Sequence, residues 1–326
     1  MSILIPAYNA EKWITDTIRS ALAQTWNPKE IIVVNDGSTD RTLELARRFE
    51  QDSVVVISQE RRGASAARNN AFENCHGDYI QWLDADDLLA TEKIEKQMEA
   101  VGECNDNRML MSSPWGQFFY RPDRAKFTPS ALWCDLSPSE FLVRKMGQDV
   151  FLQTSTWLVS RELTEAAGPW NTSISLDDDG EYFCRVLLAS NGIRFVPGAN
   201  VYYRSVGIHS LGRDTRSDGA LEGLWRSMQN HMSCLRSLDD SERARAACLT
   251  YMQNRMTDFY PRRLDMVAEM QHIAVDMGGQ LQVPRLSWKY SWIKSLFGWR
   301  CAQQARLFLP HLKWSVARGW DKILLQ

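Results

Sequence analysis

The stretch EIIVVNDGSTD, residues 30–40, decides the fold class. Ile31–Val34 is apolar at every position, so both faces of the strand that it forms are expected to be buried, as in a parallel sheet covered by helices. A turn at Asp36 and Gly37 follows, and residues 38–40 are of the types that begin helices. A buried strand followed at once by a turn and a helix predicts an α/β fold.

The same alternation of strand and helix extends to both sides of this stretch. Strands are expected at Ser2–Pro6, Glu30–Asn35, Ser53–Ser58 and Tyr79–Leu83, and helices at Ala10–Gln24, from Ser38 to about Glu50, and at Gly63–Cys75. The first helix places Trp13, Ile14 and Ile18 on one face, which suits packing against a sheet. We therefore predict an open, mostly parallel sheet flanked by helices on both faces.

Beyond residue 105 the expected elements are more varied. They are one or two strands in Arg108–Tyr120, a strand in Phe151–Ser160, a helix at Asp178–Ser190, an edge strand in Arg194–Tyr203, and two or three amphipathic helices in 218–276. We expect a domain at 1–215, with halves at 1–105 and 106–215, followed by a helical C-terminal extension at 216–326.

Polar residues follow three of the expected strands at their carboxyl ends, where open α/β sheets bind ligands. Tyr8 and Asn9 follow the first strand, Asp36 the second, and the acids of Asp84–Asp87 the fourth. The glycine-rich fingerprints GxGxxG and GxxxxGK[ST] are absent, so a phosphate would have to be held by other means. Mg²⁺ or Mn²⁺ on carboxylates is the natural candidate, because these cations prefer oxygen ligands.

Four segments resemble family 2 glycosyltransferases of the GT-A fold: PAYN at 6–9, VVNDGSTD at 33–40, GASAARN at 63–69 and DADD at 84–87. They occur in the family's order, and the resemblance as a whole covers about residues 1–210. The resemblance implies a GT-A-type sheet, with a nucleotide-sugar-binding half at 1–105 and an acceptor half at 106–215. It also implies a divalent cation, Mn²⁺ or Mg²⁺, and transfer of a sugar from a nucleotide-sugar donor to an acceptor hydroxyl.

The resemblance assigns the nucleobase to the ends of the first two strands. Pro6, Ala7 and Tyr8 would border the base, with Tyr8 stacking on it. Asp36 would accept a hydrogen bond from the imide of the base, which favours uracil or thymine and hence a UDP-sugar. The alternative is that Asp36 belongs to an ordinary strand-to-helix turn with a helix cap.

The resemblance assigns the diphosphate and the metal to the next two motifs. Arg68 would lie near the diphosphate, where a guanidinium fork suits phosphate oxygens. Asp84 would face the ribose and the metal, with Ala85 beside it in the donor site, and Asp86 would bind the metal, which stabilises the departing nucleoside diphosphate. Alternatively, Arg68 is a solvated helix residue, and Asp84–Asp87 is a solvated loop that caps the next helix.

The segment LDDDGEYFCR, residues 176–185, resembles the family's acidic motif. Aligning Glu181 and Arg185 with that motif places the catalytic base at Asp179, with Asp178 as its neighbour. An inverting transfer is a single displacement in which a base removes the proton of the acceptor hydroxyl, so one carboxylate is needed. The choice between Asp178 and Asp179 stays open, as does the alternative that these acids merely favour a helix N-terminus.

His209 follows the last expected strand. In GT-A enzymes a histidine in this position can approach the metal or close over the donor, although a lone histidine is more often structural. The Gln-x-x-Arg-Trp signature of processive family members is absent, which predicts the transfer of one sugar to each acceptor.

The C-terminal tail is basic and rich in tryptophan. From residue 281 to 326 it carries eight Lys and Arg residues and one acid, Asp321. Trp288, Trp292, Leu296 and Trp299 form one helical stripe, a pattern typical of a helix that lies on a membrane surface. The alternative is that these residues pack within the protein or in a dimer.

The net charge and the cysteine pattern limit the classes of function that the protein is expected to have. A net charge of −2 gives no general attraction to nucleic acid. Seven scattered cysteines, without a secretory leader or transmembrane stretch, favour a cytoplasmic protein, which the tail could hold against the inner membrane face. We expect a metal-dependent inverting glycosyltransferase acting on a glycan or lipid-linked acceptor in bacterial cell-surface synthesis. The alternatives are a non-catalytic nucleotide-sugar-binding protein and a sugar nucleotidyltransferase.

Overall fold

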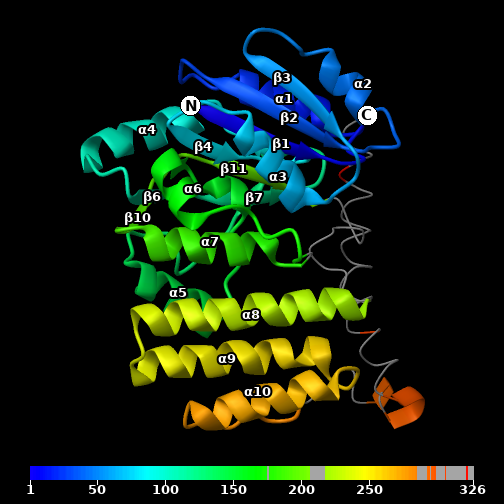
Figure 1. The fold of residues 1–326 in the computed structure, drawn as a ribbon, viewed down its shortest axis with the longest axis vertical. Helices are drawn as coiled ribbons and strands as arrows, with labels where there is room; N and C mark the ends of the chain where they lie inside the picture. The colour runs from blue at the N-terminus through cyan, green and yellow to red at the C-terminus, as the bar shows by residue number, and fades with distance from the viewer. Residues whose placement is uncertain are drawn as a thin grey trace.

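The first unit of the protein is a five-stranded sheet with the order β3-β2-β1-β4-β9 (Figure 1). The computed structural model describes residues 1–174, 176–205, 217–284, 292–293, 295–298, 305 and 321. The strands of the sheet are β1 (Ser2–Ala7), β2 (Glu30–Asp36), β3 (Val54–Gln59), β4 (Tyr79–Trp82) and β9 (Val159–Ser160). The first four pair in parallel and β9 pairs antiparallel with β4. The predicted open, mostly parallel sheet is confirmed.

Both faces of this sheet are buried. Leu4 packs on the face covered by α3 (Ala64–Glu73), whereas Ile3 packs on the face covered by α1 (Ile14–Leu22) and α2 (Thr42–Arg47). Successive residues of a strand point to opposite faces, so burial of both faces explains why β1 and β2 are almost continuously apolar. All three helices lie within their predicted ranges and are shorter than them.

Two smaller sheets continue the fold, and they correct one prediction. Their strands are β5 (Leu88–Leu89), β6 (Met109–Ser112), β7 (Trp115–Phe118), β8 (Lys126–Phe127), β10 (Gly192–Phe195) and β11 (Val201–Arg204), in the orders β5-β11-β7-β8 and β10-β6. The predicted single edge strand in Arg194–Tyr203 is wrong. A turn at Gly198, with φ of 81°, separates β10 from β11, and β11 lies inside its sheet.

Within the fully described segment Phe151–Ser160 no single strand forms, contrary to the prediction. A 3-10 turn, η2 (Thr154–Thr156), precedes the two-residue strand β9. Buried Gln81 and Gln97 donate hydrogen bonds of 2.9 and 3.0 Å from their Nε2 atoms to backbone carbonyl oxygens of this turn. A strand would offer those carbonyls to a neighbouring strand, so tertiary contacts outweigh the local pattern.

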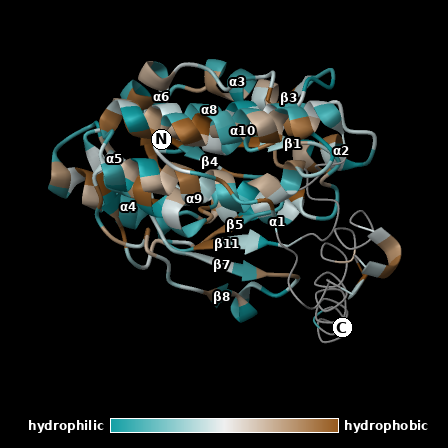
Figure 2. Ribbon diagram, turned by 90° about the horizontal axis from the view of Figure 1, so that it is seen from below, coloured by the Kyte–Doolittle hydropathy of each residue, from teal (hydrophilic) through white to brown (hydrophobic). Residues whose placement is uncertain are grey.

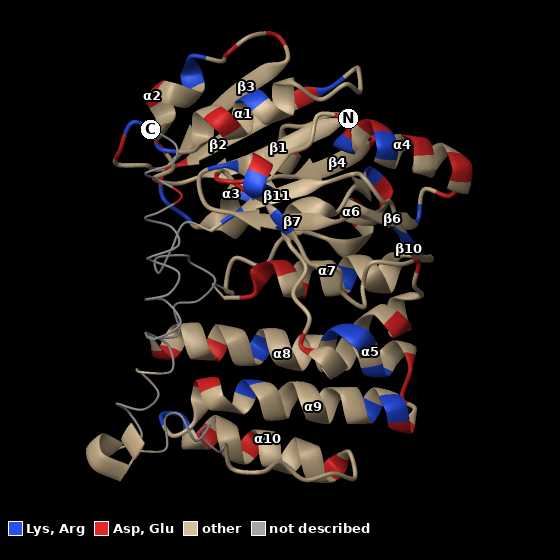
Figure 3. Ribbon diagram, turned by 180° about the vertical axis from the view of Figure 1, so that it is seen from behind, with Lys and Arg blue, Asp and Glu red and all other residues tan. Residues whose placement is uncertain are grey.

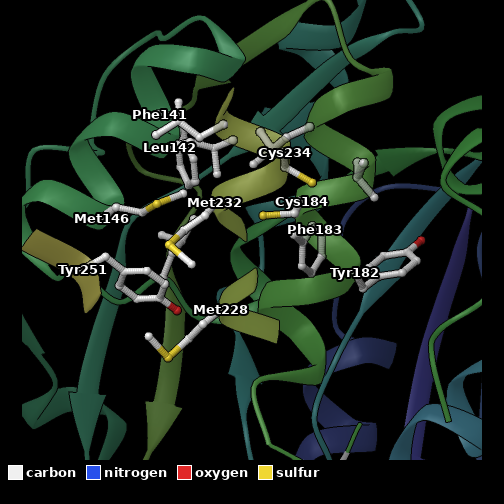
Figure 4. Packing of buried hydrophobic residues seen from close by; sticks show 14 of the residues in the cluster. Phe141, Leu142, Met146, Tyr182, Phe183, Cys184, Met228, Met232, Cys234 and Tyr251 are labelled. Carbon is white, nitrogen blue, oxygen red and sulfur yellow. The ribbon is translucent and has the colours of Figure 1, made fainter. Parts of the chain in front are cut away.

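Most of the remaining helices form layers beneath the sheet, and the first of them lies beside it at the level of β4 (Figure 1). They are α4 (Lys93–Cys104), α5 (Pro138–Gln148), α6 (Arg161–Ala167), α7 (Asp178–Ala189), α8 (Asp218–Leu238), α9 (Glu242–Phe259) and α10 (Leu264–Asp276), and a short 3-10 turn, η1 (Pro122–Arg124), follows β7. Figure 4 shows Met228 and Met232 of α8 gathered with Cys184 of α7 and Tyr251 of α9. One hydrophobic core therefore runs from the sheet to α10. The helical C-terminal region is confirmed, and the domain boundary at 215 stays a prediction.

The described part of the Trp-rich tail is apolar and largely exposed. Trp292, Leu296 and Phe297 have exposed fractions of 58%, 70% and 64%, whereas Ile293 is buried. The short helical piece at 295–298 stands apart from the main body of the protein (Figure 2). Among the described residues, no helix is long and apolar enough to cross a membrane.

The acid of the tail contacts the segment that follows β7. Asp321 accepts hydrogen bonds from the backbone nitrogen of Tyr120 (3.0 Å) and from Nε of Arg121 (2.8 Å). Trp288 and Trp299, the other members of the predicted stripe, lie outside the described residues. The described residues of the tail therefore include an acid bonded to the segment after β7 and an exposed apolar piece.

Candidate active site

The carboxyl ends of β1 and β2 lie side by side and are joined by hydrogen bonds. Pro6 and Ala7 end β1, which pairs in parallel with β2. Asn9, with φ of 48°, accepts a hydrogen bond from the backbone nitrogen of Thr39 (2.8 Å), and its own backbone nitrogen donates to Oγ of Ser38 (3.1 Å). The structure therefore brings together the polar residues that follow these two strands in the sequence.

Tyr8 projects beside the loop that follows β3. The guanidinium carbon of Arg61 lies 4.2 Å from the centroid of the Tyr8 ring, a cation–π contact. This contact orients the ring at the end of β1, where the resemblance predicts the nucleobase.

Asp36 forms hydrogen bonds with the loop that follows β3. Its carboxylate accepts hydrogen bonds of 2.8 Å from Nε2 of Gln59 and from the backbone nitrogens of Arg62 and Gly63. The side chain that bonds to the start of α2 belongs instead to Asp40, which accepts from the backbone nitrogen of Thr42 (2.9 Å). Asp36 therefore shapes the loop that leads into α3.

Arg68 connects the two acidic segments of the chain. Its terminal nitrogens donate to Oδ1 of Asp84 (2.9 Å) and to Oδ2 of Asp178 (2.8 Å), and its guanidinium carbon lies 4.3 Å from the centroid of a Trp170 ring. The side chain is buried. Although burial opposes ionisation, the neighbouring carboxylates raise the pKa of Arg68 above its ordinary value. Arg68 is therefore a fixed positive charge and not a solvated helix residue.

The acids after β4 differ in their surroundings. Burial, followed by the charge of Asp84, raises the pKa of Asp86 to about 7. Asp87 is fully buried, and it accepts hydrogen bonds from Nε2 of Gln153 and from the backbone nitrogen of Arg204 (2.8 Å). Nε of Arg204 donates to the backbone oxygen of Asp86 (2.8 Å), which fixes the turn. This turn is held within the protein and is not a solvated loop.

The start of α7 is acidic (Figure 3), and the two candidate bases there have different partners. Asp178 accepts hydrogen bonds from Arg68 and from Oγ of Ser65 (3.1 Å), so its charge is balanced. Asp179 accepts from Oγ1 of Thr154 (3.2 Å). Burial, followed by the charges of Asp177 and Asp178, raises the pKa of Asp179 to about 7. The carboxyl of Asp179 is therefore easier to protonate than an ordinary aspartate.

Sequence reasoning missed several residues that line or support this site. Thr154 contacts Asp179 from a predicted strand that does not form, Ser65 and Trp170 contact the Asp178–Arg68 pair, and Arg204 supports the turn after β4. Ser65 lies in the segment GASAARN, but the sequence pattern assigns it no role. Thr154 and Arg204 belong to no motif, so only the tertiary structure brings them to the site. His209 lies outside the described residues.

A parallel sheet with acids after β4, and a second acidic motif joined to them through one arginine, define a GT-A-type protein. A profile of glycosyl transferase family 2 matches residues 2–166, about half of the chain. The protein belongs to glycosyl transferase family 2.

Two relatives illustrate the similarity in sequence. TuaG of Bacillus subtilis, a glycosyltransferase named for teichuronic acid biosynthesis, is 40% identical over 106 residues, which cover 32% of this chain and 42% of TuaG. An uncharacterized glycosyltransferase of Rickettsia typhi is 38% identical over 111 residues, which cover 34% of this chain and 35% of the relative. The matched part spans less than half of each relative.

Two solved structures share the fold. Staphylococcus aureus TarS 1–349 in complex with UDP-GlcNAc has a TM-score of 0.65 at 18% identity, covering 85% of this chain and 80% of TarS 1–349. A mannosyltransferase from Pyrobaculum calidifontis, in complex with GDP-Man and Mn²⁺, has a TM-score of 0.52 at 17% identity, covering 98% of this chain and 84% of that enzyme.

Proposed function

We propose that this protein transfers a single sugar from a UDP-sugar to an acceptor hydroxyl, with metal assistance and inversion at the anomeric carbon. The observation that carries the proposal is the bridge made by Arg68, which links Asp84 of the donor segment to Asp178, the neighbour of the candidate base. The bridge supports a common site for the donor phosphates and the proton-accepting carboxylate.

The donor half of the proposal rests on the ends of β1 and β2. Pro6, Ala7 and Tyr8 would border the base, with the Tyr8 ring already oriented by Arg61. Asp36 would accept from the uracil imide with lone pairs that its bonds to the loop leave over, since a carboxylate has about four acceptor sites. TarS, a neighbour in fold, is known in complex with UDP-GlcNAc.

The residues after β4 fit a divalent cation. No group of three or more His, Cys, Asp and Glu side chains suited to a metal occurs among the described residues. Mg²⁺ and Mn²⁺, however, often bind through one or two carboxylates plus substrate phosphates, and Asp84 and Asp86 supply two carboxylates. When bound, such a cation offsets charge on the departing diphosphate. His209 remains a candidate further ligand.

The base is proposed to be Asp179. Asp178 is paired with Arg68 and Ser65, so its carboxylate is already engaged as a structural anion. Asp179 has a neutral hydroxyl partner, and its pKa of about 7 matches proton transfer at neutral pH. In this mechanism Asp179 takes the proton of the acceptor hydroxyl, and the positive charge of Arg68 lies near the diphosphate.

The acceptor is proposed to be a glycan or lipid-linked precursor of the bacterial cell surface. Support comes from the name of TuaG and from the exposed apolar residues Trp292, Leu296 and Phe297 beside a basic tail, which suit the surface of an anionic membrane. The protein would then act in the cytoplasm, at the inner membrane face.

A thermal-shift screen of nucleotide sugars with and without Mn²⁺ tests the proposal, because a bound ligand raises the melting temperature. We expect the largest shift from one UDP-sugar with Mn²⁺, and slow hydrolysis of that donor. Binding without hydrolysis or transfer would favour a non-catalytic binder. Formation of a nucleotide sugar from a sugar phosphate and UTP would favour a nucleotidyltransferase.

A further inference from the structure

Asp177, which lies just before the two candidate bases, does not behave as a helix cap. It has φ of 60°, a left-handed conformation, and its side chain makes no capping bond to α7. Its Oδ2 instead accepts a hydrogen bond of 2.8 Å from Oγ of Ser227 on α8, which also donates to its backbone oxygen (3.1 Å). The residue that precedes the acids is thus tied to a C-terminal helix.

A buried histidine faces the same carboxylate. Nε2 of His231 lies 3.7 Å from Oδ2 of Asp177, and among the described residues it has no hydrogen-bond partner. Its Nδ1 lies 3.0 Å from the hydroxyl of Tyr251 on α9. Burial, followed by the charge of Lys145, lowers the pKa of His231 to about 4, so the ring is neutral at neutral pH. If the Tyr251 hydroxyl donates to Nδ1, the proton on Nε2 points toward Asp177.

The packing at the start of α7 leaves no space for a side chain at residue 180. Gly180, in the first turn of α7, is approached so closely that a Cβ there would lie 2.3 Å from Oδ1 of Asp177 and 2.8 Å from Cε1 of His231. A side chain at this position would push apart the start of α7 and α8. The glycine therefore permits the contact between Asp177 and His231.

We propose that Asp177 is a positioning residue for the base Asp179, and that Ser227, His231 and Tyr251 hold it in place from the C-terminal helices. This inference rests on the proposed function, in which Asp179 takes the acceptor proton. Under this inference, α8 and α9 contribute to the reaction because they support Asp177. Both helices lie outside the segment 2–166 that the family profile matches.

The charges around the two carboxylates support this role. Burial raises the pKa of Asp177, but nearby positive charge and the hydrogen bond from Ser227 lower it overall. Because the His231 ring is neutral at neutral pH, Lys145 supplies that positive charge there. Ionised Asp177 in turn helps to raise the pKa of Asp179. The titratable and charged groups that face one or both carboxylates are Lys145 of α5, Cys184 of α7, His231 of α8, Tyr251 and Arg255 of α9, Arg68 of α3 and Asp178.

Two variants separate the charge of Asp177 from its position. Asp177→Asn keeps the size and tolerates the left-handed backbone but removes the charge. We expect the pKa of Asp179, followed by ¹³C NMR of labelled aspartate carboxyls and assigned with Asp179→Asn, to fall by about one unit. Asp177→Gly keeps the backbone but removes the side chain, and should lower kcat for the UDP-sugar found in the screen by about tenfold or more at unchanged KM.

Asp276→Asn is the matched control, because it removes one exposed charge from the end of α10, and it should change neither quantity. The inference is overturned if the pKa of Asp179 is unchanged in Asp177→Asn, or if kcat of Asp177→Gly equals that of the wild type. If either variant fails to fold, Ser227→Ala and Tyr251→Phe should show smaller changes in the same direction, and wild-type values for both overturn it equally. Full activity of Asp179→Asn would instead refute the proposed base, and the NMR titration distinguishes the two failures because it needs no donor.

Discussion

The acidic turn after β4 and the acidic start of α7 are built alike but are suited to different partners. Each has one carboxylate bonded to Arg68, Asp84 in the first and Asp178 in the second. Each also has one carboxylate whose pKa burial raises to about 7, Asp86 and Asp179. Asp86 lies beside the carboxylate of Asp84, with which we propose that it binds a cation, whereas Asp179 lies against the hydroxyl of Thr154. A buried negative charge is unfavourable in both regions. We propose that a metal ion neutralises it after β4 and that a proton neutralises it at the start of α7.

Asp179→Asn tests the proton half of this comparison and should have the largest effect. The amide keeps the size but cannot take a proton, so transfer should fall by about 10²–10⁴-fold while UDP affinity is retained. In the wild type, kcat should decline below about pH 7, where Asp179 becomes protonated. Asp178→Asn is the comparison variant. An inactive Asp178→Asn beside an active Asp179→Asn would exchange their roles.

Asp86→Ala tests the metal half. Without this carboxylate, the gain in UDP affinity that Mn²⁺ produces should disappear, a loss on the order of a hundredfold. Calorimetry with UDP, at pH 8 so that Asp86 is ionised in the wild type, measures the change. An unaltered Mn²⁺ dependence would show that the turn after β4 binds no metal.

Asp36→Ala tests whether the donor region extends to the end of β2. The hydrogen bond from a uracil imide to a carboxylate contributes roughly 1.5–3 kcal/mol, so UDP should bind about tenfold more weakly or worse, with a smaller effect on kcat at saturating donor. Because Asp36 also holds the loop at residues 59–63, Gln59→Ala serves as a control for that loop. Equal losses in both variants would assign Asp36 to the loop alone.

Removal of residues 286–326 should have the smallest effect on the site. The nucleotide-dependent thermal shift should persist, whereas co-sedimentation with anionic vesicles should be lost, since basic residues near such a surface contribute about 1 kcal/mol each. Binding of the intact chain should weaken as salt rises. The paired substitutions Trp292→Ser and Leu296→Ser provide a milder form of the same test. Intact protein that stays in the supernatant at low salt would end the membrane proposal.

Periodicity and strand-end chemistry in the sequence predict the sheet and the donor segment. Continuous apolar runs specify buried parallel strands, and the polar residues that end them must meet at one edge, because parallel strands share their carboxyl ends. For that reason Tyr8, Asp36 and the acids after β4 could be placed without a structure. The segment at 151–160 could not, because buried glutamines from β4 and α4 bind its backbone.

The sequence by itself determined the fold class, the helical C-terminal region and the candidate acids. The tertiary structure decided how those acids differ from one another. The bridge from Arg68 to Asp84 and Asp178, the contact of Thr154 with Asp179, and the support of Asp177 from α8 each join residues far apart in the chain. A carboxylate's charge state depends on which groups surround it in space, and the order of residues along the chain does not contain that information.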